Sequence, residues 1–195
     1  MENLDDYNFK VFQSIPGEYV DQVDKLLKEI DSNHRIKNDA SLSEESKEMY
    51  DSNKDAFKYI LTLDKEKVVG LVILYKREII FKDRKLILGG FGGVGTKSKY
   101  RGRGIANKMM EITRKLLQEE SCDIAHIDVD MSNLSLLRLY GKIGFVPLGR
   151  QFTFIGRSGK RYYSNDGMLA PILSQKLFEE VMKDRHPFDI YGGNW

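Results

Sequence analysis

The sequence predicts a single α/β (α+β) domain over residues 1–195, with helices flanking one sheet, on three observations. A chain of 195 residues, 41% hydrophobic and 11% aromatic, is long enough for one core and too short for two large ones. Strand-like apolar runs are interspersed with segments of helical periodicity, which is typical of helices packed on a sheet. Seven of the 17 glycines lie in one stretch, residues 89–106, in the middle of this pattern.

The first part of the chain predicts short strands and one amphipathic helix. Val20, Val23, Leu26, Leu27 and Ile30 recur at three- and four-residue steps, which places them on one helical face. The charged turn 64–66 predicts a hairpin between the two strand-like runs beside it. The expected elements are a strand 9–12, a helix 19–30, a polar loop 31–43, a surface helix 42–51 and strands 57–63 and 67–75, followed by a turn at 82–84.

The second part begins with the strongest helix prediction, residues 104–120, where Ile105, Met109, Ile112 and Leu116 form one apolar stripe. Residues 124–131 alternate like a strand, with Ile127 on one face and His126 on the other. The remaining expected elements are a helix capped by Asn133 and ending near residue 143, strands 152–155 and 168–173 separated by a loop, a helix 174–183 and an irregular tail 187–195.

Composition favours a cytoplasmic protein without nucleic-acid or membrane partners. The formal net charge is +2, so no strong field attracts phosphate backbones or anionic lipid. Cys122 is the single cysteine and cannot form an internal disulfide; we interpret it as a buried thiol. No apolar run reaches the roughly 20 residues that span a bilayer, and the N-terminus lacks a signal-peptide pattern. We expect no metal cofactor, and a homodimer is compatible with the sequence.

The glycine-rich stretch predicts a groove for an elongated, phosphate-bearing ligand. Glycine weakens a strand and lets another group approach its backbone, while glycines at a helix start leave bare N–H groups that bind phosphate. Residues 90–95 match G-x-G-x-x-G, but in a dinucleotide-binding unit the helix would begin at those glycines. The order Gly95, Thr96, Lys97 and Ser98 does not match a triphosphate P-loop.

The second half of the stretch fits (Gln/Arg)-x-x-Gly-x-(Gly/Ala) between a strand and a long helix. Small residues at Gly102, Gly104 and Ala106 leave room for a pyrophosphate against the amides, and the helix dipole adds attraction. Arg101 and Arg103 flank this site with positive charge. Arginines also occur at helix starts as solvated surface, but that interpretation does not explain the paired glycines.

Together with a second motif, this segment resembles the GCN5-related N-acetyltransferase (GNAT) superfamily. The second motif consists of Asn133, Leu136, Leu139, Tyr140, Gly144 and Phe145. The resemblance implies a mixed, mostly antiparallel sheet that splays between its fourth and fifth strands, and an acyl-CoA core at about residues 57–147. It implies acetyl-CoA, or another acyl-CoA, as donor. Its pantetheine arm would pair with Val94, Gly95 and Thr96, and its pyrophosphate would lie on Arg101, Gly102, Arg103, Gly104, Ile105 and Ala106.

The resemblance also implies roles in acyl transfer for three positions. A backbone N–H near Val94 would polarise the thioester carbonyl, and Tyr140 would protonate the leaving thiolate. Tyr140 could equally be a packing residue. Asn133 would touch the cofactor, although a helix N-cap explains it as well.

The general base is open at this stage. Many family members carry a glutamate at the position that corresponds to Gly92, on the acceptor side, and this chain has none. The candidates are water relays, Asp128, Asp130 and the carboxylate of the last residue, Trp195. His126 lies on the same strand face, but a lone strand histidine is more often structural.

The stretch from Gly149 to Gly159, the segment 165–167 and the final residue Trp195 resemble the C-terminal part of aminoglycoside 2'-N-acetyltransferases. This resemblance implies that residues 148–195 lie on the acceptor side. Asp166, Asp189 and Trp195 would bind a cationic sugar through charge-assisted hydrogen bonds and ring stacking. The alternative is a hydrophobic tail anchored in the core. The implied activity is acetylation of a primary amine on a small cationic acceptor, with antibiotic resistance as a role. The alternatives are a protein or peptide N-acetyltransferase and a non-catalytic acyl-CoA-binding module.

Overall fold

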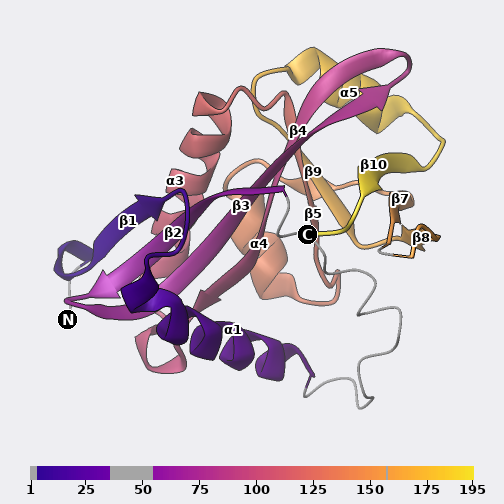
Figure 1. Ribbon diagram of the computed structural model, residues 1–195. Helices are drawn as coiled ribbons and strands as arrows, with labels where there is room; N and C mark the ends of the chain where they lie inside the picture. The colour runs from indigo at the N-terminus through magenta and orange to yellow at the C-terminus, as the bar shows by residue number, and fades with distance from the viewer. Residues whose placement is uncertain (1–3, 36–54, 157) are drawn as a thin grey trace.

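The computed structural model describes residues 4–35, 55–156 and 158–195 (Figure 1). A seven-stranded sheet has the order β1-β2-β3-β4-β5-β9-β6. Its neighbours are antiparallel except for β4 and β5, which are parallel. The fold is therefore the predicted mixed, mostly antiparallel sheet flanked by helices. Its strands are β1 (Asn8–Phe12), β2 (Ala56–Asp64), β3 (Lys67–Phe81), β4 (Arg84–Thr96), β5 (Ile124–Asp128), β6 (Val146–Pro147) and β9 (Gly167–Pro171).

A second, three-stranded sheet is built from the C-terminal third of the chain. Its order is β10-β7-β8, with β7 (Phe152–Ile155) antiparallel to β8 (Arg161–Ser164) and parallel to β10 (Phe188–Gly192). β10 carries the chain back over the main sheet, so that the C-terminus lies over its middle (Figure 1).

The helices cover the two faces of the main sheet and give two apolar layers. On one face, α3 (Ile105–Glu119) and α4 (Leu134–Gly141) pack against the strands through Ile105, Met109 and Tyr140. On the other face lie α1 (Val20–Arg35), α5 (Gln175–Lys183) and the second sheet, which contribute Val23 and Phe152. The apolar stripe predicted for residues 104–120 thus faces the core, with Ile105, Met109 and Leu116 buried.

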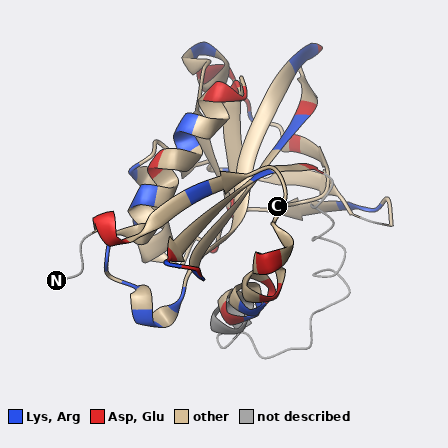
Figure 2. Cartoon of the chain, turned by 60° about the vertical axis from the view of Figure 1, so that its left-hand side comes forward, with Lys and Arg blue, Asp and Glu red and all other residues tan. Residues whose placement is uncertain are grey.

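Charges of both signs are interspersed on the outside of the fold. Figure 2 shows Lys and Arg alternating with Asp and Glu along α3. Some of these side chains form ion pairs along the helix. Lys108 pairs with Glu111 three residues later, and Lys115 pairs with Glu119 four residues later. Within the described ranges, no helix is both long and apolar enough to cross a membrane.

Most of the expected elements are confirmed, and five expectations are wrong. α1 continues to Arg35, so the polar loop does not begin at residue 31, and β3 runs to Phe81 rather than 75. β5 ends at Asp128 rather than 131. The tail contains β10, because that strand depends on a distant partner, β7. The loop after β7 contains β8, which forms a hairpin with β7 but is exposed or half-buried along its length, so it carries no apolar run. The helix expected at 42–51 lies outside the described residues.

Candidate active site

The two central strands separate in the middle of the sheet. β4 and β5 pair only at Leu88–Ile124, Gly89–Ala125 and Gly90–His126. Beyond Gly90, β4 continues to Thr96 and remains paired with β3. The parallel ladder therefore ends where the glycine-rich segment begins to turn away from β5.

A bulge follows on β4 at Gly93 and Val94. The register with β3 changes from Ile73–Gly92 to Leu71–Gly95, so β4 uses one residue more than β3 over this stretch. Gly93 has a φ of +58°, a left-handed conformation that glycine adopts without strain. An extra residue in one strand is left out of the ladder, which presents its backbone polar groups to a ligand instead.

A cavity of about 650 Å³ lies beside this bulge, between β4, the start of α3 and α4. It contains six of the ten predicted donor-binding residues. Its lining consists of Ile30, Val94, Gly95, Thr96, Arg101, Ala106, Asn107, Asp130, Asn133, Ser135, Leu136, Arg138, Leu139 and Lys142. The strand motif and the α4 motif, about 40 residues apart in the chain, thus line one cavity.

The start of α3 supplies an anion-binding geometry at one side of this cavity. The N-cap is Gly104, with a φ of +83° and no side-chain cap. The N–H groups of the first turn have no partner within the helix, and the helix dipole is positive at this end. An anionic group lying against Ala106 would accept from these amides.

The two arginines of the motif have different positions. Arg101 lines the cavity, and its Nε donates to the Thr96 carbonyl at 3.1 Å. Arg103 instead donates to the Tyr7 hydroxyl at 2.8 Å and to the Lys99 carbonyl at 2.9 Å. Ile105 is 1% exposed and belongs to the core. Arg101 is therefore the arginine placed for a ligand, and Arg103 ties the loop to the N-terminal segment.

α4 contributes a cap and a buried hydroxyl. The Asn133 side chain accepts from the Leu136 N–H at 3.3 Å and also lines the cavity, so its cap and ligand roles are compatible. Tyr140 is 6% exposed and packs edge-on against Phe91, with ring centroids 5.2 Å apart. Burial raises the pKa of Tyr140 well above its usual value, so the hydroxyl keeps its proton at neutral pH.

The opposite face of the separation is occupied by Trp195. Its Nε1 donates to the His126 carbonyl at 3.2 Å, and its ring stacks on Tyr75 at 5.6 Å between centroids. The Arg77 guanidinium lies over the indole at 3.8 Å. The ring is 6% exposed and lies directly against the backbone of Gly90. The tail is thus anchored in the core, and this anchoring places Trp195 beside Gly90 and Gly92, where β4 separates from β5.

Arg77 holds this tail to β3. Its Nη1 donates to the carbonyls of Ile190 and Gly193 at 2.9 and 3.0 Å, and its Nη2 pairs with Asp55 at 2.5 Å. Burial lowers the pKa of Arg77 to about 10, which leaves it cationic at neutral pH. Sequence reasoning did not identify Arg77, because an arginine within a strand carries no pattern that points to a distant tail.

The predicted acceptor-side carboxylates divide into two groups. Asp128 accepts from the Asn194 Nδ2 at 2.5 Å, and the Asp166 carboxylate lies close enough to raise its pKa further. Burial is the main cause that raises the pKa of Asp128 from 3.8 to about 6. Asp189 is instead paired with Arg161 at 2.7 Å. Its charge is already compensated, which leaves Asp128 and Asp166 as the better partners for a cation.

His126 is enclosed in the core. Its ring is 0% exposed, with its centroid 4.4 Å from that of Phe152. Burial lowers its pKa to about 3, so it is neutral at physiological pH. Neither ring nitrogen has a hydrogen-bond partner among the described residues, and the side chain has no route to an acceptor. Over the same residues, no group of three His, Cys, Asp or Glu side chains is placed to hold a metal ion.

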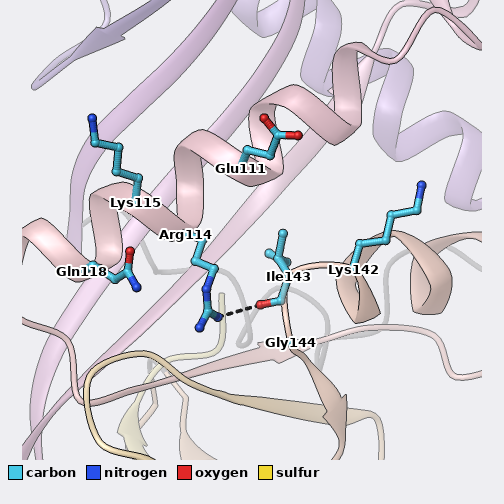
Figure 3. A pocket seen from close by; sticks show the side chains of 7 residues that line it. All are labelled: Glu111, Arg114, Lys115, Gln118, Lys142, Ile143 and Gly144. Atoms are coloured by element: carbon cyan, nitrogen blue, oxygen red, sulfur yellow. Dashed lines mark hydrogen bonds between the residues drawn. The ribbon is translucent and has the colours of Figure 1, made fainter.

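A second hollow, of about 490 Å³, lies between α3 and the end of α4 (Figure 3). Figure 3 shows Arg114 pointing from α3 to the Ile143 carbonyl, to which it donates at 2.7 Å. Arg114 thereby caps the end of α4. Lys142 borders both hollows and donates to the Asn107 side chain at 3.0 Å. Arg138 on α4 and Lys142, at its C-cap, lie four residues apart, a spacing that could have identified a basic helix face from the sequence.

The mixed sheet, the separation of β4 from β5 beside a cavity and the glycine-rich start of α3 are the features expected of a GNAT fold. A family model described as "Acetyltransferase (GNAT) family" matches residues 23–145. The chain belongs to this family.

Two curated relatives match part of the chain. N-alpha-acetyltransferase 30 of Saccharomyces cerevisiae is 37% identical over 79 residues, which is 40% of this chain and 40% of that protein. N-alpha-acetyltransferase MAK3 of Arabidopsis thaliana is 28% identical over 94 residues, 48% of this chain and 47% of that protein. The matches span less than half the length of these relatives. Neither is named as an aminoglycoside acetyltransferase.

Solved structures share the fold at low identity. A GNAT family N-acetyltransferase (YhbS) from Escherichia coli, in complex with CoA, has a TM-score of 0.58 at 13% identity and covers 95% of this chain and 88% of its own. The NatC complex bound to Gag peptide and CoA contains a chain with a TM-score of 0.53 at 18% identity, covering 85% of this chain and 98% of its own.

Proposed function

We propose that the protein is an N-acetyltransferase that moves an acetyl group from acetyl-CoA to a primary amine. The observation that carries the proposal is the cavity between β4 and α4, which has the Gly93–Val94 bulge on one side and the uncapped start of α3 on the other. Such a site suits a ligand with an amide-rich arm and a pyrophosphate, since both need backbone hydrogen bonds.

The residues present fit such a donor. Val94, Gly95 and Thr96 would pair with the pantetheine arm, and the first turn of α3, with Arg101 beside it, would bind the pyrophosphate. Arg138 and Lys142 add positive charge at the α4 side of the cavity. Residues 57–147 would thus carry the donor site, and residues 148–195 the acceptor side.

Acyl transfer needs a polarised carbonyl, a positioned amine and a proton for the leaving thiolate. The bulge supports a backbone N–H near Val94 as the donor to the carbonyl oxygen. Tyr140 is the candidate to protonate the sulfur. It lies on α4 next to Leu139, which lines the cavity, and its hydroxyl is protonated at neutral pH.

For the acceptor, the names of the two curated relatives support the α-amino group of a peptide or protein chain. A different observation favours a small cationic amine as second candidate. Asp166 lies beside the end of β5, where its carbonyl accepts from the Val129 N–H at 2.9 Å, and its carboxylate raises the pKa of Asp128. A cation there would relieve the repulsion between the two carboxylates.

The experiment combines calorimetry with an acceptor screen. Binding of CoA is measured first by isothermal titration, and free thiol release from acetyl-CoA is then followed with peptides of varied N-terminal sequence, polyamines and aminoglycosides. Acetylation of peptides or of small amines assigns the acceptor class. CoA binding without release on any amine would instead identify a non-catalytic acyl-CoA-binding module, and absence of CoA binding would refute the proposal.

A further inference from the structure

Asp128 and Gly92 occupy equivalent positions on the two strands that separate. The parallel ladder pairs each residue of β4 with the residue 36 positions later on β5, as in Gly90–His126. Two residues further along each strand, this register reaches Gly92 on β4 and Asp128 on β5. Because neighbouring residues in a parallel sheet project to the same face, both positions face the same side of the separation.

That side is the one that holds the C-terminal tail. A Cβ on Gly92 would lie 3.4 Å from the backbone carbonyl carbon of Trp195, and His126 projects to the same layer, against Phe152. Gly92 has no side chain with which to accept a proton. Among the strand residues at this level of the separation, the carboxylate therefore comes from Asp128 on β5 rather than from β4. The carboxyl carbon of Trp195, the other candidate base on this side, lies at the same level.

Asn194 fixes this carboxylate. Its side chain is 4% exposed, and its Nδ2 donates to the Asp128 Oδ2 at 2.5 Å, while its Oδ1 accepts from the Trp195 N–H at 3.1 Å. The groups that face Asp128 are Asn194 from the tail, Ser164 from β8, the Val129 N–H and the Asp166 carboxylate. Three of these donate hydrogen bonds, and Asp166 is the charged group among them. Among the described residues, the groups that act on Asp128 include no cation, and no cation forms an ion pair with its carboxylate.

We propose that Asp128 accepts the proton of the acceptor amine, and that Asn194 is the residue that positions it. This inference rests on the proposed function. As the amine nitrogen forms its bond to the acetyl carbon, its proton passes to a carboxylate oxygen of Asp128. The carbon–sulfur bond breaks with its electron pair going to sulfur, and the resulting thiolate takes a proton from Tyr140. The transfer leaves Asp128 protonated and Tyr140 deprotonated; release of the Asp128 proton to water and uptake of a proton from water by Tyr140 restore both residues, so that atoms and charges balance over the cycle.

The test compares Asp128→Asn with the unsubstituted protein, using whichever amine the screen identifies. Because a positioned general base contributes about 10²–10⁴-fold, we expect kcat to fall by at least about 10²-fold. The KM for acetyl-CoA and the affinity for CoA should be unchanged, which also shows that the variant is folded. Asp83→Asn removes an exposed carboxylate at the β3–β4 turn and serves as the matched control, with full activity expected.

The pH profile of kcat separates a proton-accepting role from a structural one. The unsubstituted protein should lose activity as pH falls through the pKa of Asp128, and Asp128→Asn should lack this acidic limb. Asn194→Ala removes a hydrogen bond that stabilises the carboxylate, so it should move the acidic limb to higher pH. The inference is overturned if Asp128→Asn is fully active, or if it keeps the acidic limb. If no amine is acetylated by the unsubstituted protein, the proposed function itself fails, and this inference with it.

Discussion

The substitution Gly90→Ala should displace the Trp195 indole from the separation between β4 and β5. A Cβ at position 90 would overlap the indole Nε1, lie 2.5 Å from its Cε2 and lie 2.7 Å from the His126 carbonyl oxygen. The carbonyl belongs to the paired part of β5 and cannot move without breaking the sheet. The side chain that can leave is the indole, which would lose its hydrogen bond to that carbonyl, its stacking on Tyr75 and its contact with Arg77.

The size of the effect follows from what the indole loses. An aromatic side chain buries about 150–250 Å², worth roughly 4–6 kcal/mol at about 25 cal/mol per Å² as an upper value. Measured losses for truncating a buried Trp or Phe are about 3–5 kcal/mol. We therefore expect Gly90→Ala to lower the free energy of unfolding by about 4 kcal/mol. For a domain of this size that corresponds to a fall in Tm of about 8–16 °C.

The assay is intrinsic fluorescence, because Trp195 is the single tryptophan of the chain. In Gly90→Ala the emission maximum should shift to longer wavelength in the folded state, as the indole enters water, and chemical denaturation should report the lower stability. Gly92→Ala is the matched control on the same strand face. Its Cβ would meet Tyr75 at 3.3 Å and the Trp195 backbone at 3.4 Å, contacts that small shifts relieve. Equal emission and stability in Gly90→Ala and the unsubstituted protein would refute this account of Gly90.

Three further predictions concern the donor site and Asp128. Arg101→Ala should weaken CoA binding by about 10–100-fold, since a charge-assisted hydrogen bond contributes about 1.5–3 kcal/mol. Arg103→Ala should weaken it much less. Calorimetry on both variants compares their affinities for CoA, and equal losses would contradict the assignment of Arg101 as the ligand-binding arginine. Tyr140→Phe should lower kcat by about 10²-fold while CoA affinity and stability stay unchanged, as followed by thiol release and thermal unfolding; an unchanged kcat would exclude Tyr140 as the acid. Asp128→Asn should stabilise the fold at pH 7. The folded pKa of Asp128, about 6, is above the ordinary value of 3.8, so ionisation costs the folded state up to about 3 kcal/mol above pH 6, and this cost disappears below pH 4. Denaturation at pH 7 and pH 4 measures it, and an equal effect of the substitution at both values would contradict the pKa assignment.

The parts of the fold that the sequence predicts correctly are those with a local signal. The stripe of α3 repeats over four turns, and the cap at Asn133 lies directly before α4, so periodicity and capping suffice. β10 has no such signal, because it is short and pairs in parallel with β7, 36 residues earlier at Phe188–Phe152. The end of β3 is similar: residues 76–81 are strand because β4 pairs with them, although their own pattern is charged.

The difference between local signals and distant contacts also decides which parts of the site the sequence could predict. The proposed donor side is formed by backbone and by residues in compact motifs, and the cavity brings together the strand and helix motifs from which the sequence predicted it. The acceptor side depends on contacts between residues far apart in the chain. Asn194 and Asp128 are 66 positions apart, and Arg77 reaches the tail over more than 110 positions. No spacing rule predicts such pairs from one sequence.

The structure also changes the reason for the glycines of β4. At positions 89, 90 and 95 the space of a Cβ is taken by the protein's own side chains, namely those of Leu117 and Cys122, Trp195 and Ile30. A glycine-rich strand therefore need not mean a ligand along its whole length, since helices and the tail approach it from both faces. What distinguishes the part proposed to face the ligand is the bulge at Gly93 and Val94, where β4 leaves the β3 register after it has already left β5. The glycines before the bulge let the core close tightly around the strand, and that closure holds the bulge, Gly92 and Asp128 at one level of the separation. Rigidity supplied by the core is what a transfer site needs, because the amine and the carbonyl react only when both are held in place.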